Sequence, residues 1–264
     1  MFDFVISSSY GNDSIALIQW CIDKNLGNVA VVYMDTGWAA PFWKDRVDKG
    51  EELVLRAGFK SVYLESVGME SLIRKKKAWP SRLMQFCTEK LKMEPFHEFL
   101  ASVDKDKDSI VMVGVRREES TARANWPEFL EESNKAAGRS VWSPLVNYTA
   151  SERDELIKKA GFEVLTHRSQ ECYPCVNANK ADLLMLDEER VQKIEDLEES
   201  LGFTSKGKPR TMFRPHKKMG AIGIREIIKW AHSPRGKYQA PELGGGGCDS
   251  GFCETADGLK LFDV

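Results

Sequence analysis

The chain has no long apolar run among its 264 residues. No stretch of about 18 apolar residues, the length of a membrane helix, occurs in it. The opening residues 1–6 also lack the basic segment and apolar run of a secretory leader. The sequence therefore predicts no membrane span and a cytoplasmic protein.

The chain also lacks a strong net charge, because its formal charge at pH 7 is only −2. The molecule as a whole has no field that would draw it onto nucleic acid, so only local segments could do so. Two basic segments are present, at residues 74–77 and 206–218. Such runs are commonly solvated faces, and that is the expectation for residues 74–77.

Cysteine is scarce, with six residues in the chain. Cys172 and Cys175 form a CxxC pair, which is typical of metal binding or redox chemistry rather than of a secreted disulfide framework. Cys21 falls on the apolar face of a predicted helix, where we expect it to pack in the core. A reducing compartment follows from this usage.

Short β-branched runs alternate with amphipathic patterns over the first two thirds of the chain. Strands are predicted at residues 2–7, 28–34, 61–67, 110–114 and 140–145, and helices at 13–24, 41–57 and 88–103. This alternation predicts an α/β fold, with a mainly parallel sheet and helices on both faces.

The last third of the chain has a different pattern. Residues 182–201 and 221–232 predict two helices that form a helical cap, followed by a glycine-rich tether at 244–247 and a cysteine-bearing tail. We therefore predict a nucleotide-binding domain over residues 1–180 and a C-terminal extension over residues 181–264.

A serine-rich segment follows the first predicted strand. In a parallel sheet, ligands bind at the carboxyl ends of strands, where backbone amides and helix N-termini point at an anion. The spacing is not that of a Walker A loop, and a turn that merely caps a helix is the alternative. The phosphate-binding candidates are Ser7, Ser8, Ser9, Gly11, Asn12, Asp13 and Ser14.

A second polar segment follows the fourth predicted strand. Arg116, Arg117 and Arg123 place three guanidinium groups close after Gly114. Guanidinium groups bind phosphate or sulfate in a bidentate manner. We therefore predict that these arginines bind the anion.

Together these segments resemble the phosphoadenylyl-sulfate (PAPS) reductase family of the PP-loop superfamily. Four residues of the serine-rich segment match its SxGxDS form, with Asn12 in place of the common lysine. Residues 34–41, 114–125 and 142–149 are similar to three further family segments, in the family's order. The resemblance implies an adenine nucleotide alpha hydrolase-like fold, an adenosine site at Asp35, Thr36 and Gly37, and a catalytic role for Asp13.

The resemblance also implies a role for the cysteines. Iron–sulfur members carry a Cys-Cys pair that joins a later CxxC to hold a [4Fe-4S] cluster, and here Cys87 and Thr88 occupy the first pair. A fourth ligand would come from the tail, so Cys87, Cys172, Cys175 and Cys253 form the predicted set, with Cys248 in reserve. Zinc, or no metal, is the alternative. Cys253 is also the counterpart of the family's tail nucleophile.

Three functions remain open. The first is reduction of a PAPS or APS (adenylyl sulfate) nucleotide with a thioredoxin-like electron donor. The second is ATP pyrophosphatase chemistry with Mg²⁺, in which a nucleic acid contacted by residues 206–218 is adenylylated for sulfur insertion. The third is a non-catalytic sensor of nucleotide or cluster. The sequence makes no prediction about the oligomeric state.

Overall fold

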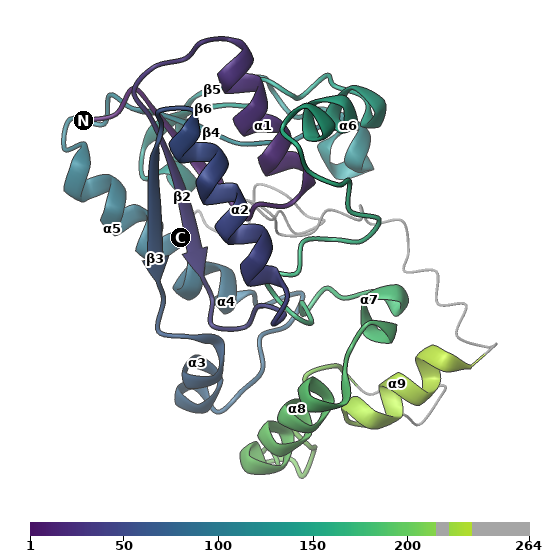
Figure 1. Cartoon of the computed structure of the whole chain (residues 1–264). Coiled ribbons are helices and arrows are strands. Elements are labelled where there is room, and N and C mark those ends of the chain that lie inside the picture. The colour runs from purple at the N-terminus through teal and green to yellow at the C-terminus, as the bar shows by residue number, and fades with distance from the viewer. Residues whose placement is uncertain (215–221, 234–264) are drawn as a thin grey trace.

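The computed structural model describes residues 1–214 and 222–233. Across these residues, strands form one sheet in the order β3-β2-β1-β4-β6-β5 (Figure 1). The strands are β1 Phe4–Ser8, β2 Val29–Asp35, β3 Lys60–Glu65, β4 Ile110–Met112, β5 Phe129–Ser133 and β6 Arg139–Trp142. All neighbours pair in parallel except β5, which runs antiparallel to β6 at the edge.

Helices cover both faces of the sheet (Figure 1). One face packs against α1 Asn12–Asp23, α2 Trp43–Arg56 and α6 Ala150–Lys159. The other face packs against α5 Glu94–Val103. Helix α5 continues from the short helix α4 Phe86–Thr88 through a π-helical turn at Glu89–Met93. The remaining helices are α3 Met69–Lys76, α7 Lys180–Leu184, α8 Glu188–Leu201 and α9 Ile224–His232.

The two faces explain the nearly continuous apolar runs of the central strands. In β1, Ile6 packs with α1 while its neighbour Val5 packs with α5. In β2, Val31 and Val32 divide in the same way between the two cores. A parallel strand that is buried on both sides needs apolar residues at successive positions rather than in alternation.

The predicted fold class is confirmed, since the predicted strands and helices of the first two thirds are all present. Three elements are additional. Helix α6 was missed because its sequence, ASERDELIKK, is strongly charged and buries only Ile157. Strand β5 was missed because its sequence, FLEES, is mostly exposed and carries two glutamates. Helix α3 was missed because residues 74–77 dominate its composition, although Met69, Leu72 and Ile73 give it a buried face.

The single helix predicted over residues 182–201 is wrong, because the chain forms α7 and α8 with a break between them. Asp187 ends that break, since its side chain accepts a hydrogen bond from the Arg190 amide as the N-cap of α8. Helix α8 then packs Val191, Ile194 and Leu197 into a core that it shares with α3 and Trp38. The Cys21 side chain is buried in the main core, as predicted.

Among the residues that the structure describes, no helix combines the length and the apolar character needed to span a membrane.

Candidate functional site

The loop after β1 is held by its own hydroxyl groups. The Ser9 amide donates to the Ser14 Oγ at 3.2 Å, and the Gly11 amide donates to the Ser9 Oγ at 3.2 Å. Tyr10 has a left-handed backbone with φ of 55°. Gly11 is the N-cap of α1 and supplies no capping side chain, so an anion can bind there instead.

Asn12 occupies the position of the family's common lysine, but its side chain points to another segment. The Asn12 Nδ2 donates to the Leu165 carbonyl at 2.9 Å, and the Leu165 amide donates to the Asn12 Oδ1 at 3.0 Å. The Asn12 side chain therefore anchors Leu165 to the start of α1. Its expected contribution to a phosphate site is limited to the backbone amide.

The loop after β4 lies directly against the loop after β1. A Cβ on Gly114 would lie 2.8 Å from the Asp13 carbonyl oxygen, so only glycine allows this approach. The buried Arg116 Nε donates to the Asp13 Oδ1 at 2.8 Å. Arg153 of α6 lies 3.8 Å from the same oxygen. The structure thus brings Arg116 to the serine-rich loop, as the anion-site prediction requires.

Glu119 links the other predicted residues to this group. Its carboxylate accepts hydrogen bonds from the Arg116 amide, at 3.0 Å, and from the Arg123 guanidinium. Burial raises the pKa of Glu119 to about 7, with a further contribution from the Asp13 carboxylate, while Arg123 opposes the shift. Glu119 was not among the predicted site residues, although its position in the sequence between Arg117 and Arg123 could have indicated that it pairs with these arginines.

Arg117 differs from the other two arginines. Its Nε donates to the Trp126 carbonyl at 2.9 Å and its other end contacts the Asn147 side chain. Of the three predicted arginines, Arg116 and Arg123 lie with Asp13 and Glu119. Arg153 adds a third guanidinium to that cluster, and the sequence carried no pattern that marked it.

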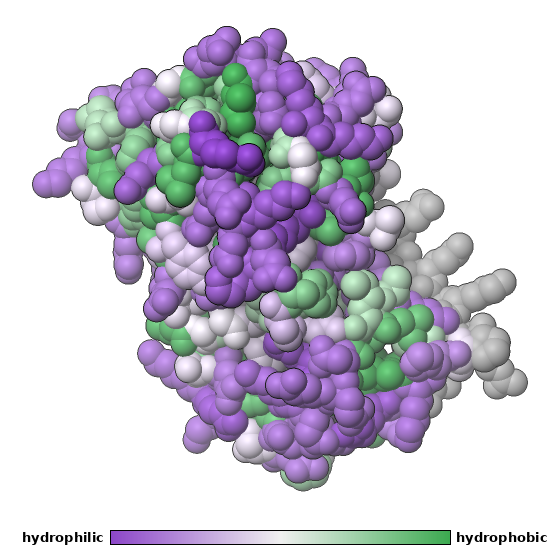
Figure 2. All heavy atoms as spheres, in the orientation of Figure 1, coloured by the Kyte–Doolittle hydropathy of each residue, from purple (hydrophilic) through white to green (hydrophobic). Residues whose placement is uncertain are grey.

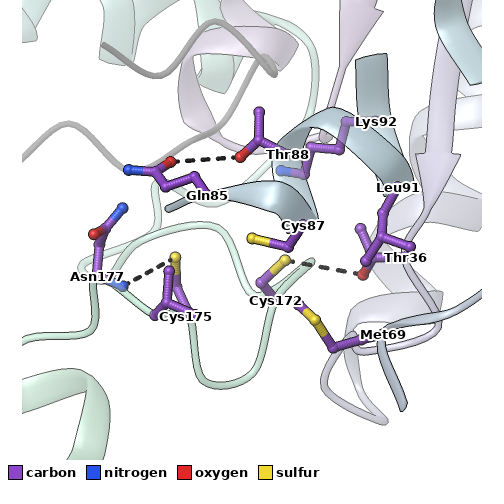
Figure 3. Close-up of a pocket in the computed structure, with 11 residues that line it drawn as sticks. Thr36, Met69, Gln85, Cys87, Thr88, Leu91, Lys92, Cys172, Cys175 and Asn177 are labelled. Atoms are coloured by element: carbon purple, nitrogen blue, oxygen red, sulfur yellow. Dashed lines mark hydrogen bonds between the residues drawn. The ribbon is translucent and has the colours of Figure 1, made fainter. Parts of the chain in front are cut away.

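A second part of the site is a pocket at the carboxyl end of β2 (Figure 3). Cys87 enters it from α4, while Cys172 and Cys175 enter it from the segment after α6. The Thr88 side chain also lines the pocket and donates to the Gln85 Oε1 at 3.5 Å. The predicted CxxC pair and Cys87 therefore meet, whereas Cys253 and Cys248 lie outside the described residues.

The thiols of this pocket belong to half-buried cysteines, and their surroundings raise their pKa values. Burial raises the pKa of Cys172 to about 12, and the positive charge of Lys92 opposes the shift. Burial and the neighbouring Cys172 raise the pKa of Cys87 to about 11. Burial and the neighbouring Cys87 also raise the pKa of Cys175. Thiols of this kind ionise when a bound cation replaces their protons.

Lys92 supplies the positive charge beside the thiols. It is buried, lines the pocket and forms an ion pair with Glu171, the residue before Cys172. Neither the lysine nor the glutamate was singled out as a site residue, although Glu171 adjoins the CxxC pair in the sequence.

The donor set of the pocket consists of the thiols of Cys87, Cys172 and Cys175. Among the described residues, no three His, Cys, Asp or Glu side chains are placed to hold a single metal ion. A zinc ion would draw all its thiolates to about 2.3 Å from one point. A four-iron cluster binds each thiolate at a different iron, so its cysteines stand farther apart. The pocket brings three thiols together beside Lys92, so its residues supply thiolate donors for either kind of centre.

The loop after β2 contacts the cysteine segment directly. The Thr36 hydroxyl donates to the Glu171 carbonyl at 2.9 Å, and the Cys172 Sγ lies 3.9 Å from the Thr36 Oγ1. The Tyr173 amide donates to the Trp38 carbonyl at 2.8 Å. Asp35 accepts from the Gly37 amide at 2.8 Å and from the Tyr63 hydroxyl at 2.6 Å. The predicted adenosine loop is therefore attached to the cysteine segment.

This sheet, with its loops at the carboxyl ends of β1, β2 and β4, is that of the adenine nucleotide alpha hydrolase-like superfamily of α/β proteins. Within that class, a family model described as "Phosphoadenosine phosphosulfate reductase domain" matches residues 3–173. The chain belongs to this family, which confirms the resemblance seen in the sequence.

Among curated proteins, the chain is similar to an uncharacterized 37.8 kDa protein in the gpa 5' region of Escherichia phage 186. The two are 26% identical over 183 residues, which make up 61% of this chain and 55% of the phage protein. The chain thus spans about half the length of that relative.

Solved structures with a similar fold include PAPS reductase from Candida auris in a phosphate complex, with a TM-score of 0.45 and 13% identity over 62% of this chain and 75% of that one. The U34-tRNA thiolase NcsA from Methanococcus maripaludis with its [4Fe-4S] cluster has a TM-score of 0.47 and 15% identity, over 75% and 66% of the two chains. NH3-dependent NAD synthetase from Campylobacter jejuni has a TM-score of 0.41 and 16% identity, over 61% of this chain and 64% of that one.

Proposed function

We propose that this protein is an enzyme of sulfur chemistry that binds an adenine nucleotide next to a cysteine-held iron–sulfur centre. The observation that carries the proposal is the 3.9 Å contact between Thr36 and Cys172. It joins the loop expected to close over adenosine to the pocket expected to hold the centre. A nucleotide and a sulfur group would then react within one site.

The chain's own residues would bind the nucleotide through its anionic end. The first amides of α1 have no capping side chain and present the positive end of the helix dipole. Arg116 and Arg123 lie beside this helix end, held in place by Asp13 and Glu119. An incoming phosphate or sulfate would exchange for these carboxylates as the partner of the guanidinium groups.

The identity of the nucleotide decides what Asp13 does. With ATP, the Asp13 carboxylate would bind Mg²⁺ and the amide cradle would stabilise the pyrophosphate leaving group. With PAPS or APS, Asp13 would instead keep Arg116 oriented toward the anion, as it does in the ion pair of 2.8 Å.

Cys87, Cys172 and Cys175 would hold the iron–sulfur centre, with Cys253 as fourth ligand or, alternatively, as the nucleophile. When bound, a four-iron cluster supplies electron transfer or an iron site that binds sulfur. Lys92 would offset the negative charge of the thiolates, and its pairing with Glu171 keeps it in the pocket.

Turnover assays distinguish the two nucleotides. Sulfite released from PAPS or APS in the presence of thioredoxin supports reduction, whereas pyrophosphate released from ATP and stimulated by DNA or tRNA supports activation of a nucleic acid. Tight nucleotide binding without either product would assign the protein to the non-catalytic sensors, and the enzyme proposal would be wrong.

The centre is tested by anaerobic purification with absorption spectra and iron and sulfide analysis. We expect a brown protein whose colour and iron are lost in Cys175→Ser and retained in the matched control Cys21→Ala, because Cys21 is buried in the core away from the pocket. A colourless wild type without iron would contradict the proposal. Cys253→Ser distinguishes the two roles of Cys253. Loss of iron would indicate that Cys253 is a ligand, whereas loss of sulfite release with the iron retained would indicate that it is the nucleophile.

A further inference from the structure

Two basic segments that are far apart in the sequence lie together in the structure. Residues 74–77 end α3, and residues 203–210 form a hairpin after α8, closed by a bridge between Phe203 and Pro209. The Arg210 guanidinium donates to the Lys77 carbonyl, and Arg74 donates to the Ser200 Oγ at 3.2 Å. Helices α3 and α8 lie side by side in Figure 1.

We call this composite area the basic surface, and its members are Lys75, Lys76, Lys77, Lys206, Lys208 and Arg210. The five lysines are exposed. Within residues 1–214 and 222–233, none of them forms an ion pair, whereas Arg74 and Lys193 nearby both pair with Glu70. Glu199, at the end of α8, is the exposed carboxylate next to the hairpin. Figure 2 shows hydrophilic side chains over this lower part of the molecule.

Exposed apolar side chains accompany the charges. Phe203, at the base of the hairpin, is 69% exposed, and Leu83 and Met84, in the loop after α3, are 67% and 63% exposed. A basic surface with an exposed aromatic ring suits a single-stranded nucleic acid, whose phosphates pair with lysine and whose unpaired bases stack on the ring. An acidic peptide would use the lysines but would have no base to stack on Phe203.

The basic surface extends to the rim of the cysteine pocket. The Lys76 Nζ lies 5.9 Å from the centre of the Phe86 ring, and Phe86 precedes Cys87. The other end of α3 begins with Met69, which lines the pocket. At about 1.5 Å per residue, this short helix separates the two sites by only about 12 Å. A nucleic-acid strand bound to the basic surface would therefore reach the cysteine pocket over a length of one or two nucleotides.

We propose that the basic surface binds single-stranded nucleic acid, or an unpaired loop, and presents it to the cysteine pocket. The inference that nucleic acid binds follows from the basic surface alone, whereas the role of that nucleic acid as the sulfur acceptor rests on the proposed function. The segment assigned to nucleic acid from the sequence, residues 206–218, supplies only part of this surface. The other part comes from residues 75–77, which had been predicted to be merely a solvated face.

The test is binding of the full-length chain to labelled single-stranded RNA and DNA of about 16 nucleotides, followed by fluorescence anisotropy between about 50 and 200 mM salt. We expect micromolar dissociation constants at low salt. The variant Lys75→Ala/Lys76→Ala/Lys208→Ala should bind at least about tenfold more weakly. Its plot of log affinity against log salt should be shallower by about 2, since each lost phosphate contact contributes about 0.7.

A second triple variant, Lys60→Ala/Lys105→Ala/Lys158→Ala, is the matched control. It removes the same charge from exposed positions away from α3 and the hairpin, so its binding should equal that of the wild type. Phe203→Ala should weaken single-strand binding by about tenfold and leave duplex binding unchanged. Equal binding by the two triple variants, or polyglutamate that binds as tightly as the oligonucleotides, would overturn the inference.

The same proteins separate this inference from the proposed function. ATP and PAPS binding should be unchanged in both triple variants. A wild type that binds oligonucleotide but no nucleotide would refute the proposed function and leave the surface intact. A wild type that binds nucleotide but no oligonucleotide would refute only the surface.

Discussion

Gly114→Ala is the sharpest perturbation that the structure suggests. Gly114 follows β4 at the point where the arginine segment touches the serine-rich loop. An added Cβ would lie 2.8 Å from the Asp13 carbonyl oxygen and 3.1 Å from the Asp13 Cβ. Both neighbours belong to the first turn of α1, so they cannot move without moving the proposed phosphate site.

The size of the effect follows from that distance. Ordinary contact begins at 3.4 Å, so the overlap with the carbonyl oxygen is about 0.6 Å. Overpacking of this kind costs about 1–3 kcal/mol, and the smaller conformational freedom of alanine in the unfolded chain offsets about 0.4–1 kcal/mol. The net loss is therefore at most about 2.6 kcal/mol, which lowers the melting temperature by up to about 10 °C for a chain of this length. Displacing the amides should weaken nucleotide binding by about 10- to 100-fold.

Thermal melts and nucleotide titrations of Gly114→Ala and Gly27→Ala test this reasoning. Gly27 is the control, because a Cβ there meets nothing within 4 Å. We expect its variant to keep full nucleotide affinity and to be as stable as the wild type or slightly more so. A Gly114→Ala protein with wild-type stability and affinity would show that the two loops do not depend on each other.

Two further substitutions test the same region. Because burial and Asp13 raise the pKa of Glu119 to about 7, its carboxyl group is protonated below that pH and charged above it, where it holds Arg123 and repels an anion. Nucleotide affinity should therefore rise about tenfold as pH falls through 7, and Glu119→Gln should abolish that dependence; an unchanged pH profile would refute the role. Asn12→Ala should lower the free energy of unfolding by about 1–3 kcal/mol in a denaturant titration, because it removes two hydrogen bonds to Leu165. Nucleotide affinity should be nearly unchanged, and a large loss of affinity would place the Asn12 side-chain amide in the phosphate site.

Much of this protein could be predicted from local sequence. The central strands are nearly continuous apolar runs, and the serine-rich loop and the CxxC pair each lie within a few consecutive residues. Strand, loop and helix start are short-range features, so their residue types predict them directly. The family resemblance followed from such segments in order, and it also paired Cys87 with the later cysteines.

Only the tertiary structure decided which of these segments touch. Arg116 pairs with Asp13 across 103 positions of the chain, and the Asn12 side chain reaches Leu165 across 153. The same packing turned Arg117 away from the site and added Arg153 to it. These contacts depend on the order of strands in the sheet and on the helices packed across it. No local pattern encodes them, because the residues become neighbours only when the whole core is formed.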